Sequence, residues 1–154
     1  MNEKIEELQF FIENTKKSEI FGARKSKEFS AHKIQEFCRV PRIYEILDEI
    51  KNSEILVIVE GKKDREALQK LGIGNIIELS KKPLFQIVEE IADSNEECII
   101  LTDLDKKGKQ LYSRLNSYLQ KNGVKVNNKF REFLFKHTKL RQIEGIGTYL
   151  EHNH

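Results

Sequence analysis

The sequence predicts an α/β domain with a mostly parallel, four-stranded sheet flanked by helices, preceded by a helical extension. Three observations lead to this prediction. Short β-rich apolar runs alternate with amphipathic segments from residue 53 onward. The first run, ILVIV, is continuous rather than alternating, as expected for a strand covered on both faces. One helical segment separates each run from the next, and parallel strands need such crossover connections.

Residues 1–52 are predicted to form the helical extension, and residues 53–154 the main domain with a basic, helical C-terminal segment. Apolar residues at helical spacing within residues 5–12 indicate one helix, and a polar loop is predicted after it. A second helix follows Pro41, on the apolar positions Ile43, Ile46, Leu47 and Ile50. The extension would cap the main domain or provide a surface for a homodimer or a larger complex.

Four strands of the main domain are predicted at residues 54–59, 75–79, 98–102 and 124–126. The helices between and after them are predicted at residues 64–72, 83–94, 108–123 and 128–140, and Gly72 suits the C-terminal end of the first. The third helix is predicted to face the core with Leu111, Leu115, Tyr118 and Leu119. The last is predicted to bury Phe130, Phe133 and Leu134, which makes His137 a structural residue at the helix edge.

The bulk properties indicate a charged globular protein rather than a membrane protein. The chain has 154 residues, of which 34% are charged, and no apolar run approaches the ~20 residues that span a bilayer. Acids and bases are mixed from the first residues, unlike a signal peptide, so the cytoplasm is the expected compartment. Cys98 lies in an apolar run and is predicted to be a buried thiol.

Charge is distributed unevenly although the net charge is only +2. Residues 1–54 carry −1, residues 55–105 carry −5, and residues 106–154 carry +8. Clustered carboxylates attract cations and an adjoining basic surface attracts polyanions, so the distribution indicates partners rather than a fold.

Carboxylates stand where two of the predicted strands end. Glu60 follows the first strand, and Asp103 and Asp105 follow the third. Ligands of open parallel sheets bind beyond the carboxyl ends of the strands, so we treat the three acids as one site. A D-x-D pair can aim two carboxylates at a hard cation such as Mg²⁺, or Mn²⁺, and a third carboxylate can bind metal or transfer protons.

Other interpretations of these acids remain open. Each could be a solvated residue at a strand end. The D-x-D could also supply an aspartate nucleophile of a phosphatase-like enzyme, although that chemistry usually places the motif after the first strand.

The stretches V-E-G-K-K-D, from residue 59, and T-D-L-D-K-K-G, from residue 102, resemble the Toprim domain. This domain is shared by topoisomerases, bacterial-type primases, a class of nucleases, recombination mediators and the ribonuclease that matures 5S ribosomal RNA. The resemblance covers about residues 54–127 and is nearest to small stand-alone archaeal Toprim proteins and the Toprim half of that ribonuclease. It implies a Rossmann-like fold and Mg²⁺-dependent chemistry on nucleic acid.

The resemblance also implies roles for single residues. Glu60 matches the family glutamate, which is a general acid/base in strand-breaking members and a metal-site residue in nucleases. Asp103 and Asp105 match the Mg²⁺-binding pair. Gly61 would permit a tight turn beneath the site, and Gly108 would open the next helix. Asp64 matches a common family acid, although the helix dipole would also favour an acid there.

One position departs from the family pattern. Members with a D-x-D-x-D motif carry a third aspartate where this sequence has Lys107, so the site resembles that of primases and small nucleases more than that of topoisomerases. The chain also lacks room for a tyrosine-bearing topoisomerase domain, and it has no cysteine cluster of the primase kind.

A basic surface is predicted next to the acidic site. Lys107, Arg114 and Lys121 recur every seven residues and share a helix face, and no acid occurs from residue 106 to 131. Such a face either binds a phosphate backbone or is merely solvated. The predicted nucleic-acid-binding set is completed by Lys62, Lys106 and Lys109, and the basic character continues through Lys125, Lys129, Arg131, Lys136, Lys139 and Arg141.

Two functions follow from the sequence. The first is Mg²⁺-dependent phosphodiester chemistry on DNA or RNA, by a nuclease or processing enzyme. The second is a non-catalytic module that binds nucleic acid or recruits partners in replication, repair or RNA processing. The segment containing Glu144 could fold back toward the site, but the sequence does not determine whether it does.

Overall fold

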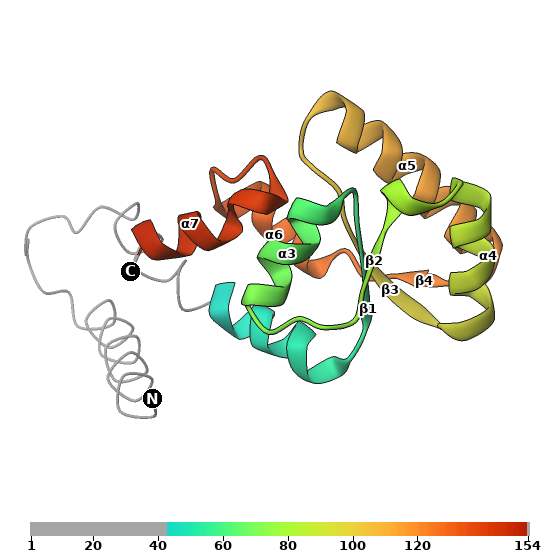
Figure 1. Ribbon diagram of the computed structural model, residues 1–154, viewed down its shortest axis with the longest axis horizontal. Coiled ribbons are helices and arrows are strands. Elements are labelled where there is room, and N and C mark those ends of the chain that lie inside the picture. Colours follow the sequence, from blue (N-terminus) through green and yellow to red (C-terminus); the bar gives the residue numbers. More distant parts are fainter. Residues whose placement is uncertain (1–42, 154) are drawn as a thin grey trace, which may run out of the picture. The chain divides into compact units, whose positions relative to one another are not determined.

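The computed structural model describes residues 43–153. The described residues belong to one compact unit of the chain. This unit is a three-layer α/β domain with a parallel sheet between two helical layers (Figure 1). The predicted fold class is confirmed.

The sheet has four strands in the order β2-β1-β3-β4, all parallel. The strands span Leu56–Val59 (β1), Ile76–Glu78 (β2), Glu97–Leu101 (β3) and Lys125–Val126 (β4). Each overlaps a predicted run. The register pairs Val59 with Leu101, so the two central strands end side by side. Both are buried along almost their whole length, which explains their continuous apolar sequence.

One face of the sheet is covered by helices from both ends of the described chain. They are a helix over residues 43–53, α3 (Lys62–Lys70), α6 (Lys129–His137), the short helix η2 (Ile143–Gly145) and α7 (Ile146–His152). Their core includes Ile50, Leu68, Phe130 and Ile146, packed with Val57 of the sheet. The predicted burial of Phe130, Phe133 and Leu134 is confirmed.

The opposite face is covered by α4 (Leu84–Ser94) and α5 (Lys106–Lys121), which pack against each other (Figure 1). Between β2 and α4 lies the short helix η1 (Leu79–Lys81). Cys98 is buried in this second core, and burial raises the pKa of its thiol to about 11, as an inert core thiol requires. The prediction that Tyr118 faces the core is wrong. Leu115 and Leu119 define the buried stripe of α5, and Tyr118 lies at its edge, 40% exposed.

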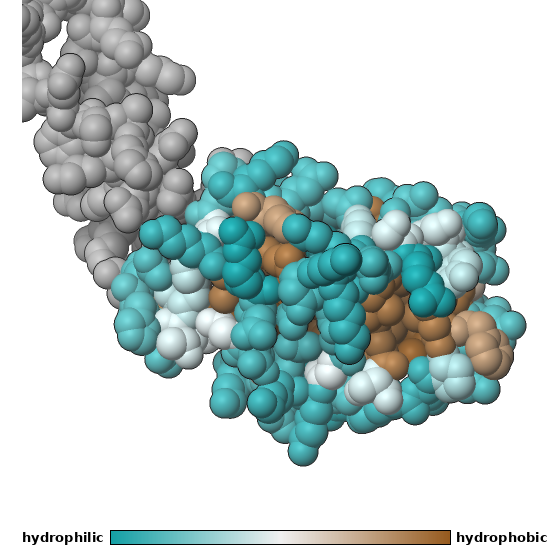
Figure 2. Space-filling model, turned by 90° about the horizontal axis from the view of Figure 1, so that it is seen from above, coloured by the Kyte–Doolittle hydropathy of each residue, from teal (hydrophilic) through white to brown (hydrophobic). Residues whose placement is uncertain are grey.

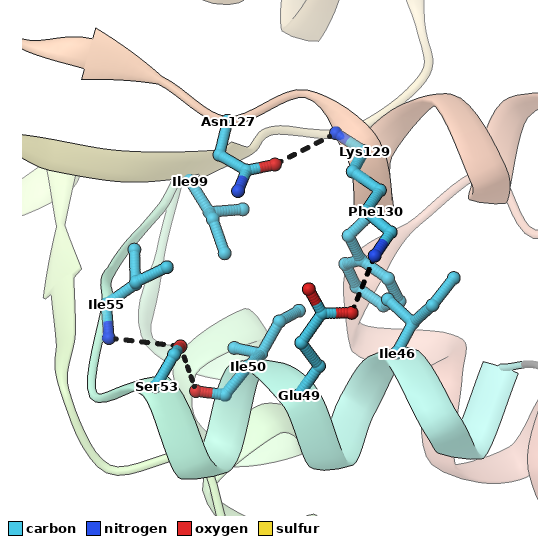
Figure 3. Close-up of a pocket in the computed structure, with 9 residues that line it drawn as sticks. All are labelled: Ile46, Glu49, Ile50, Ser53, Ile55, Ile99, Asn127, Lys129 and Phe130. Carbon is cyan, nitrogen blue, oxygen red and sulfur yellow. Dashed lines mark hydrogen bonds and ion pairs between the residues drawn. The ribbon is translucent and has the colours of Figure 1, made fainter.

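The helix over residues 43–53 shares the core of the α/β domain. Its apolar residues pack with the sheet, and Glu49 forms an ion pair of 2.7 Å with Lys129 of α6 (Figure 3). These residues line a pocket of about 40 Å³ near the amino end of β1, away from the predicted site. The remainder of the predicted extension, including its proposed dimer surface, lies outside the described residues.

No helix in the described range 43–153 combines the length and the apolar character needed to cross a bilayer.

Candidate metal centre

The carboxyl ends of β1 and β3 are joined by a hydrogen bond between the two predicted metal-binding segments. The backbone N–H of Asp103 donates to Oε1 of Glu60 over 2.9 Å. Glu60 directly follows β1 and is half-buried, and Asp103 lies in the loop after β3, one residue beyond Thr102. The structure therefore brings together the two strand ends that the sequence analysis assigned to one site.

Gly108 packs tightly against this junction from the first turn of α5. A Cβ atom at this position would lie 2.1 Å from the carbonyl oxygen of Asp103 and 2.9 Å from Oε1 of Glu60. Its carbonyl accepts a hydrogen bond of 2.9 Å from the buried hydroxyl of Thr102. Glycine is thus required here by the close approach of backbone to backbone, rather than only by the opening of a helix.

Asp105 is the N-cap of α5. Its Oδ1 accepts a hydrogen bond of 2.7 Å from the N–H of Gly108, and the residue is exposed. The cap satisfies one of the N–H groups that a helix leaves unpaired at its start. One oxygen of Asp105 therefore has a structural role, and the carboxylate has a second oxygen with which to bind a cation.

Asp64 is buried at the start of α3, where its Oδ2 accepts a hydrogen bond of 3.1 Å from the N–H of Gly61. Burial raises the pKa of Asp64 to about 6, and the charges of Asp103, Glu60 and Glu144 act in the same direction. Asp64 lies within electrostatic range of these three acids.

The expectation that Gly61 permits a tight turn is not supported. Its φ of −147° is an extended conformation that any residue adopts, and a Cβ there would meet no atom within 4 Å. Gly61 contributes its N–H to Asp64 and leaves open space beside Glu60.

Arg131 is a buried cation beneath the site, and the prediction that it belongs to the basic surface is wrong. It is 5% exposed, and its guanidinium donates to the carbonyl of Thr102 over 2.6 Å and lies 4.3 Å from the ring centre of Tyr112. Burial lowers the pKa of Arg131, whereas the negative charges of Glu60 and Asp103 act to raise it. The guanidinium thus offsets part of the negative charge of the acids above it.

Glu144 reaches the site from the C-terminal segment. It lies in η2, which packs against α3, and its carboxylate forms an ion pair of 3.9 Å with Lys63. The neighbouring Ile143 donates its N–H to Oδ1 of Asp103 over 3.0 Å. The sequence contained a signal for this segment in the helical spacing of three buried residues, Ile143, Ile146 and Leu150.

The model of the Toprim domain matches residues 55–135, which include both strand-end motifs. The chain belongs to the Toprim domain family. Its members are metal-binding domains of nucleic-acid-related proteins, and they generally bind Mg²⁺.

Known relatives are similar over most of their length. A UPF0292 protein of Methanocaldococcus jannaschii is 35% identical over 115 residues, covering 71% of this chain and 90% of the relative. A UPF0292 protein of Pyrococcus horikoshii is 41% identical over 106 residues, covering 68% and 79%. A solved structure, a putative protein from Aquifex aeolicus, superposes with a TM-score of 0.61 at 33% identity and covers 68% of this chain and 94% of its own.

The donor chemistry of this Toprim site fits a hard divalent cation. Glu60, Asp103 and Asp105 offer only oxygen ligands, which Mg²⁺ prefers. A backbone N–H holds one oxygen of each carboxylate and thereby orients the other. Among residues 43–153, however, no three His, Cys, Asp or Glu groups are close enough together to hold a metal ion as they stand. The acids of the Toprim motif are thus gathered at one edge but not clustered around a single point.

Basic side chains lie along α5 and at the start of α3 in this Toprim domain. Five of the six predicted nucleic-acid-binding residues are on α5 and all six are exposed: Lys62, Lys106, Lys107, Lys109, Arg114 and Lys121. Lys62 pairs with Glu66 at 3.6 Å, and Lys109 lies 5.6 Å from the ring centre of Phe135. Within the described part of the chain, Lys107, Arg114 and Lys121 have no carboxylate within ion-pair distance. Figure 2 shows the molecule from above relative to the view in Figure 1. The face seen there is largely hydrophilic and is interrupted by apolar areas.

We predict that Gly108→Ala lowers the free energy of unfolding by at least about 2 kcal/mol, because the new Cβ overlaps the Asp103 carbonyl. Gly147→Ala in α7 is the matched control, since a Cβ there meets no atom within 4 Å. Gly147→Ala should raise the free energy of unfolding by roughly 0.5–1 kcal/mol. Denaturant unfolding of both variants measures the difference, and equal stabilities would contradict the tight junction.

We predict that Asp64→Asn stabilises the metal-free protein at pH 7.5 by up to about 3 kcal/mol, and by much less at pH 4. The folded pKa of Asp64 is raised, so the parent loses stability as pH rises from about 4 to about 6, where the folded state must release its proton. Asparagine retains an acceptor for the Gly61 N–H and carries no charge. Denaturant unfolding in EDTA at both pH values tests this, and a pH-independent difference between the proteins would refute it.

Proposed function

We propose that this Toprim protein is a Mg²⁺-dependent phosphodiesterase that hydrolyses the backbone of DNA or RNA in the cytoplasm. The observation that carries the proposal is the hydrogen bond between Glu60 and the N–H of Asp103, which holds the two acidic strand ends together. A shared acidic edge at the carboxyl ends of parallel strands is where such folds bind ligands.

In the proposed mechanism the carboxylates have different roles. Asp103 and Asp105 would hold the cation, with Mn²⁺ as a substitute for Mg²⁺. The bound cation would supply Lewis-acid stabilisation of charge on the phosphate. The second oxygen of Glu60, which does not accept the Asp103 N–H, would either complete this metal site or accept a proton from the attacking water. The open space beside Gly61 would let the phosphate approach the backbone without a steric clash.

The exposed cations would hold the substrate in place. Lys106, Lys107 and Lys109 lie on the first turns of α5, next to the acidic edge, and Lys62 starts α3 beside Glu60. Arg114 and Lys121 continue the same helix. Contacts of this kind bind phosphates without reading sequence, so the proposal includes little sequence preference.

A non-catalytic nucleic-acid-binding or recruitment module is the second candidate. One observation favours it: each of the three Toprim acids already accepts a backbone hydrogen bond, and no group of three metal-binding side chains is clustered among residues 43–153. A site used only for binding would need no such cluster.

A cleavage assay with Glu60→Gln separates the two candidates. Single-stranded, duplex and structured DNA and RNA are incubated with Mg²⁺ or with EDTA. We expect cleavage only with Mg²⁺, and a loss of at least about 100-fold in Glu60→Gln, which keeps an acceptor for the Asp103 N–H but cannot transfer the proton.

The control for this assay is Glu89→Gln, an equal charge change on the exposed side of α4. It should cut at the parental rate. Glu60→Gln activity equal to the parent would contradict the catalytic role. Binding without cleavage of any substrate would establish the module instead.

The basic surface predicts a second result. Replacing Lys107, Arg114 and Lys121 together with alanine should weaken nucleic-acid binding and reduce the log-salt slope by roughly one unit for each phosphate that is no longer neutralised. The matched control replaces exposed lysines that do not belong to the predicted basic surface, namely Lys51, Lys70 and Lys82. Fluorescence anisotropy across a salt series measures both, and equal slopes in the two variants would show that the α5 face is only solvated.

A further inference from the structure

The C-terminal segment makes direct contacts with the acidic edge, although it lies beyond the residues 55–135 that match the Toprim domain. The N–H of Leu104 donates to the carbonyl of Arg141 over 2.8 Å. The N–H of Ile143 donates to Oδ1 of Asp103 over 3.0 Å. Both bonds join residues 141–143 to the D-L-D segment of residues 103–105. The backbone of residues 141–143 therefore helps to set the conformation of this segment.

The same segment is anchored in the core and is therefore a fixed part of the domain. Ile143, Ile146 and Leu150 are at most 3% exposed and pack in the cluster that contains Val57 and Val59 of β1. Both η2 and α7 contact α3. Groups on η2 consequently have a defined position relative to the ends of β1 and β3.

Glu144 adds negative charge at this position. Its side chain is 40% exposed and lies 3.9 Å from Nζ of Lys63, which is 82% exposed. Its charge also contributes to the raised pKa of Asp64, together with the charges of Asp103 and Glu60. The Glu144 carboxylate is thus close enough to interact electrostatically with Asp64, which also interacts with Asp103 and Glu60.

We propose that η2 forms part of the cation site, with the Ile143 N–H orienting Asp103 and Glu144 supplying a further carboxylate that raises cation affinity. Mg²⁺ keeps several of its waters in proteins, so a carboxylate near the site strengthens binding even when it accepts hydrogen bonds only from those waters. Lys63 competes with the cation for Glu144. The inference rests on the proposed cation binding at the Toprim acids.

Isothermal titration of the full chain with Mn²⁺ tests this role without any measurement of cleavage. Glu144→Gln should raise the dissociation constant by about threefold or more, since a full charge near a surface site is removed. Glu151→Gln is the control, because it removes an exposed acid from the neighbouring α7. It should change the Mn²⁺ dissociation constant by less than about half of the change in Glu144→Gln.

A second variant gives a change of opposite sign. Lys63→Gln frees Glu144 from its ion pair and removes a positive charge, so it should tighten Mn²⁺ binding. The gain should shrink when the Lys63 and Glu144 substitutions are combined, because the two residues are coupled. A structural role for η2 alone would not produce opposite effects from these two surface substitutions.

The outcomes separate this inference from the proposed function. Saturable Mn²⁺ binding by the parent, with an unchanged constant in Glu144→Gln, would overturn the role of η2 and leave the Toprim site intact. Absence of saturable binding in the parent would overturn both. Weaker binding in Glu144→Gln than in Glu151→Gln, with tighter binding in Lys63→Gln, supports the proposal.

Discussion

The hydrogen bond between the Glu60 carboxylate and the Asp103 N–H is the interaction on which the site depends. It closes only because the register of the central strands places Val59 beside Leu101, so that the loops after β1 and β3 start at the same level. A shift of one residue would move Glu60 by about 3.3 Å along the strand and break the bond. Gly108 then allows α5 to begin against this junction, which no residue with a side chain could do without moving the Asp103 backbone.

Charge balance is the second constraint on this edge of the sheet. Several carboxylates are gathered there, and like charges at short range oppose ionisation of one another, which adds to the effect of burial in raising the pKa of Asp64. Two cations offset them from different sides. Arg131 is buried below the loop and bound to the carbonyl of Thr102, whereas Lys63 is exposed and paired with Glu144. Under the proposed function, a bound divalent cation would offset the remaining negative charge.

The sequence predicted the architecture well because parallel strands buried on both faces leave continuous apolar runs, and the strand-end rule was enough to bring Glu60 and Asp103 to one edge. Features that depend on tertiary contacts were missed. A position in a basic helix suggests that Arg131 is exposed at the surface. No local sequence signal indicates that its guanidinium donates to a buried carbonyl, that of Thr102. Tyr118 follows the apolar spacing of α5 but falls at the edge of its buried stripe. The contact of Ile143 with Asp103 joins residues 40 positions apart, and only the packing of η2 and α7 on α3 creates it.

Titration of the isotopically labelled protein with Mg²⁺, followed through backbone amide resonances, tests the central claim most directly. Saturable shifts are expected at the amides that donate hydrogen bonds to the acids, because cation binding alters the carboxylates that accept these bonds. These amides are those of Gly61, Asp103, Gly108 and Ile143. Shifts that fail to saturate, or that gather at the exposed acids of α4 and leave these four amides unchanged, would contradict a cation site at the ends of β1 and β3.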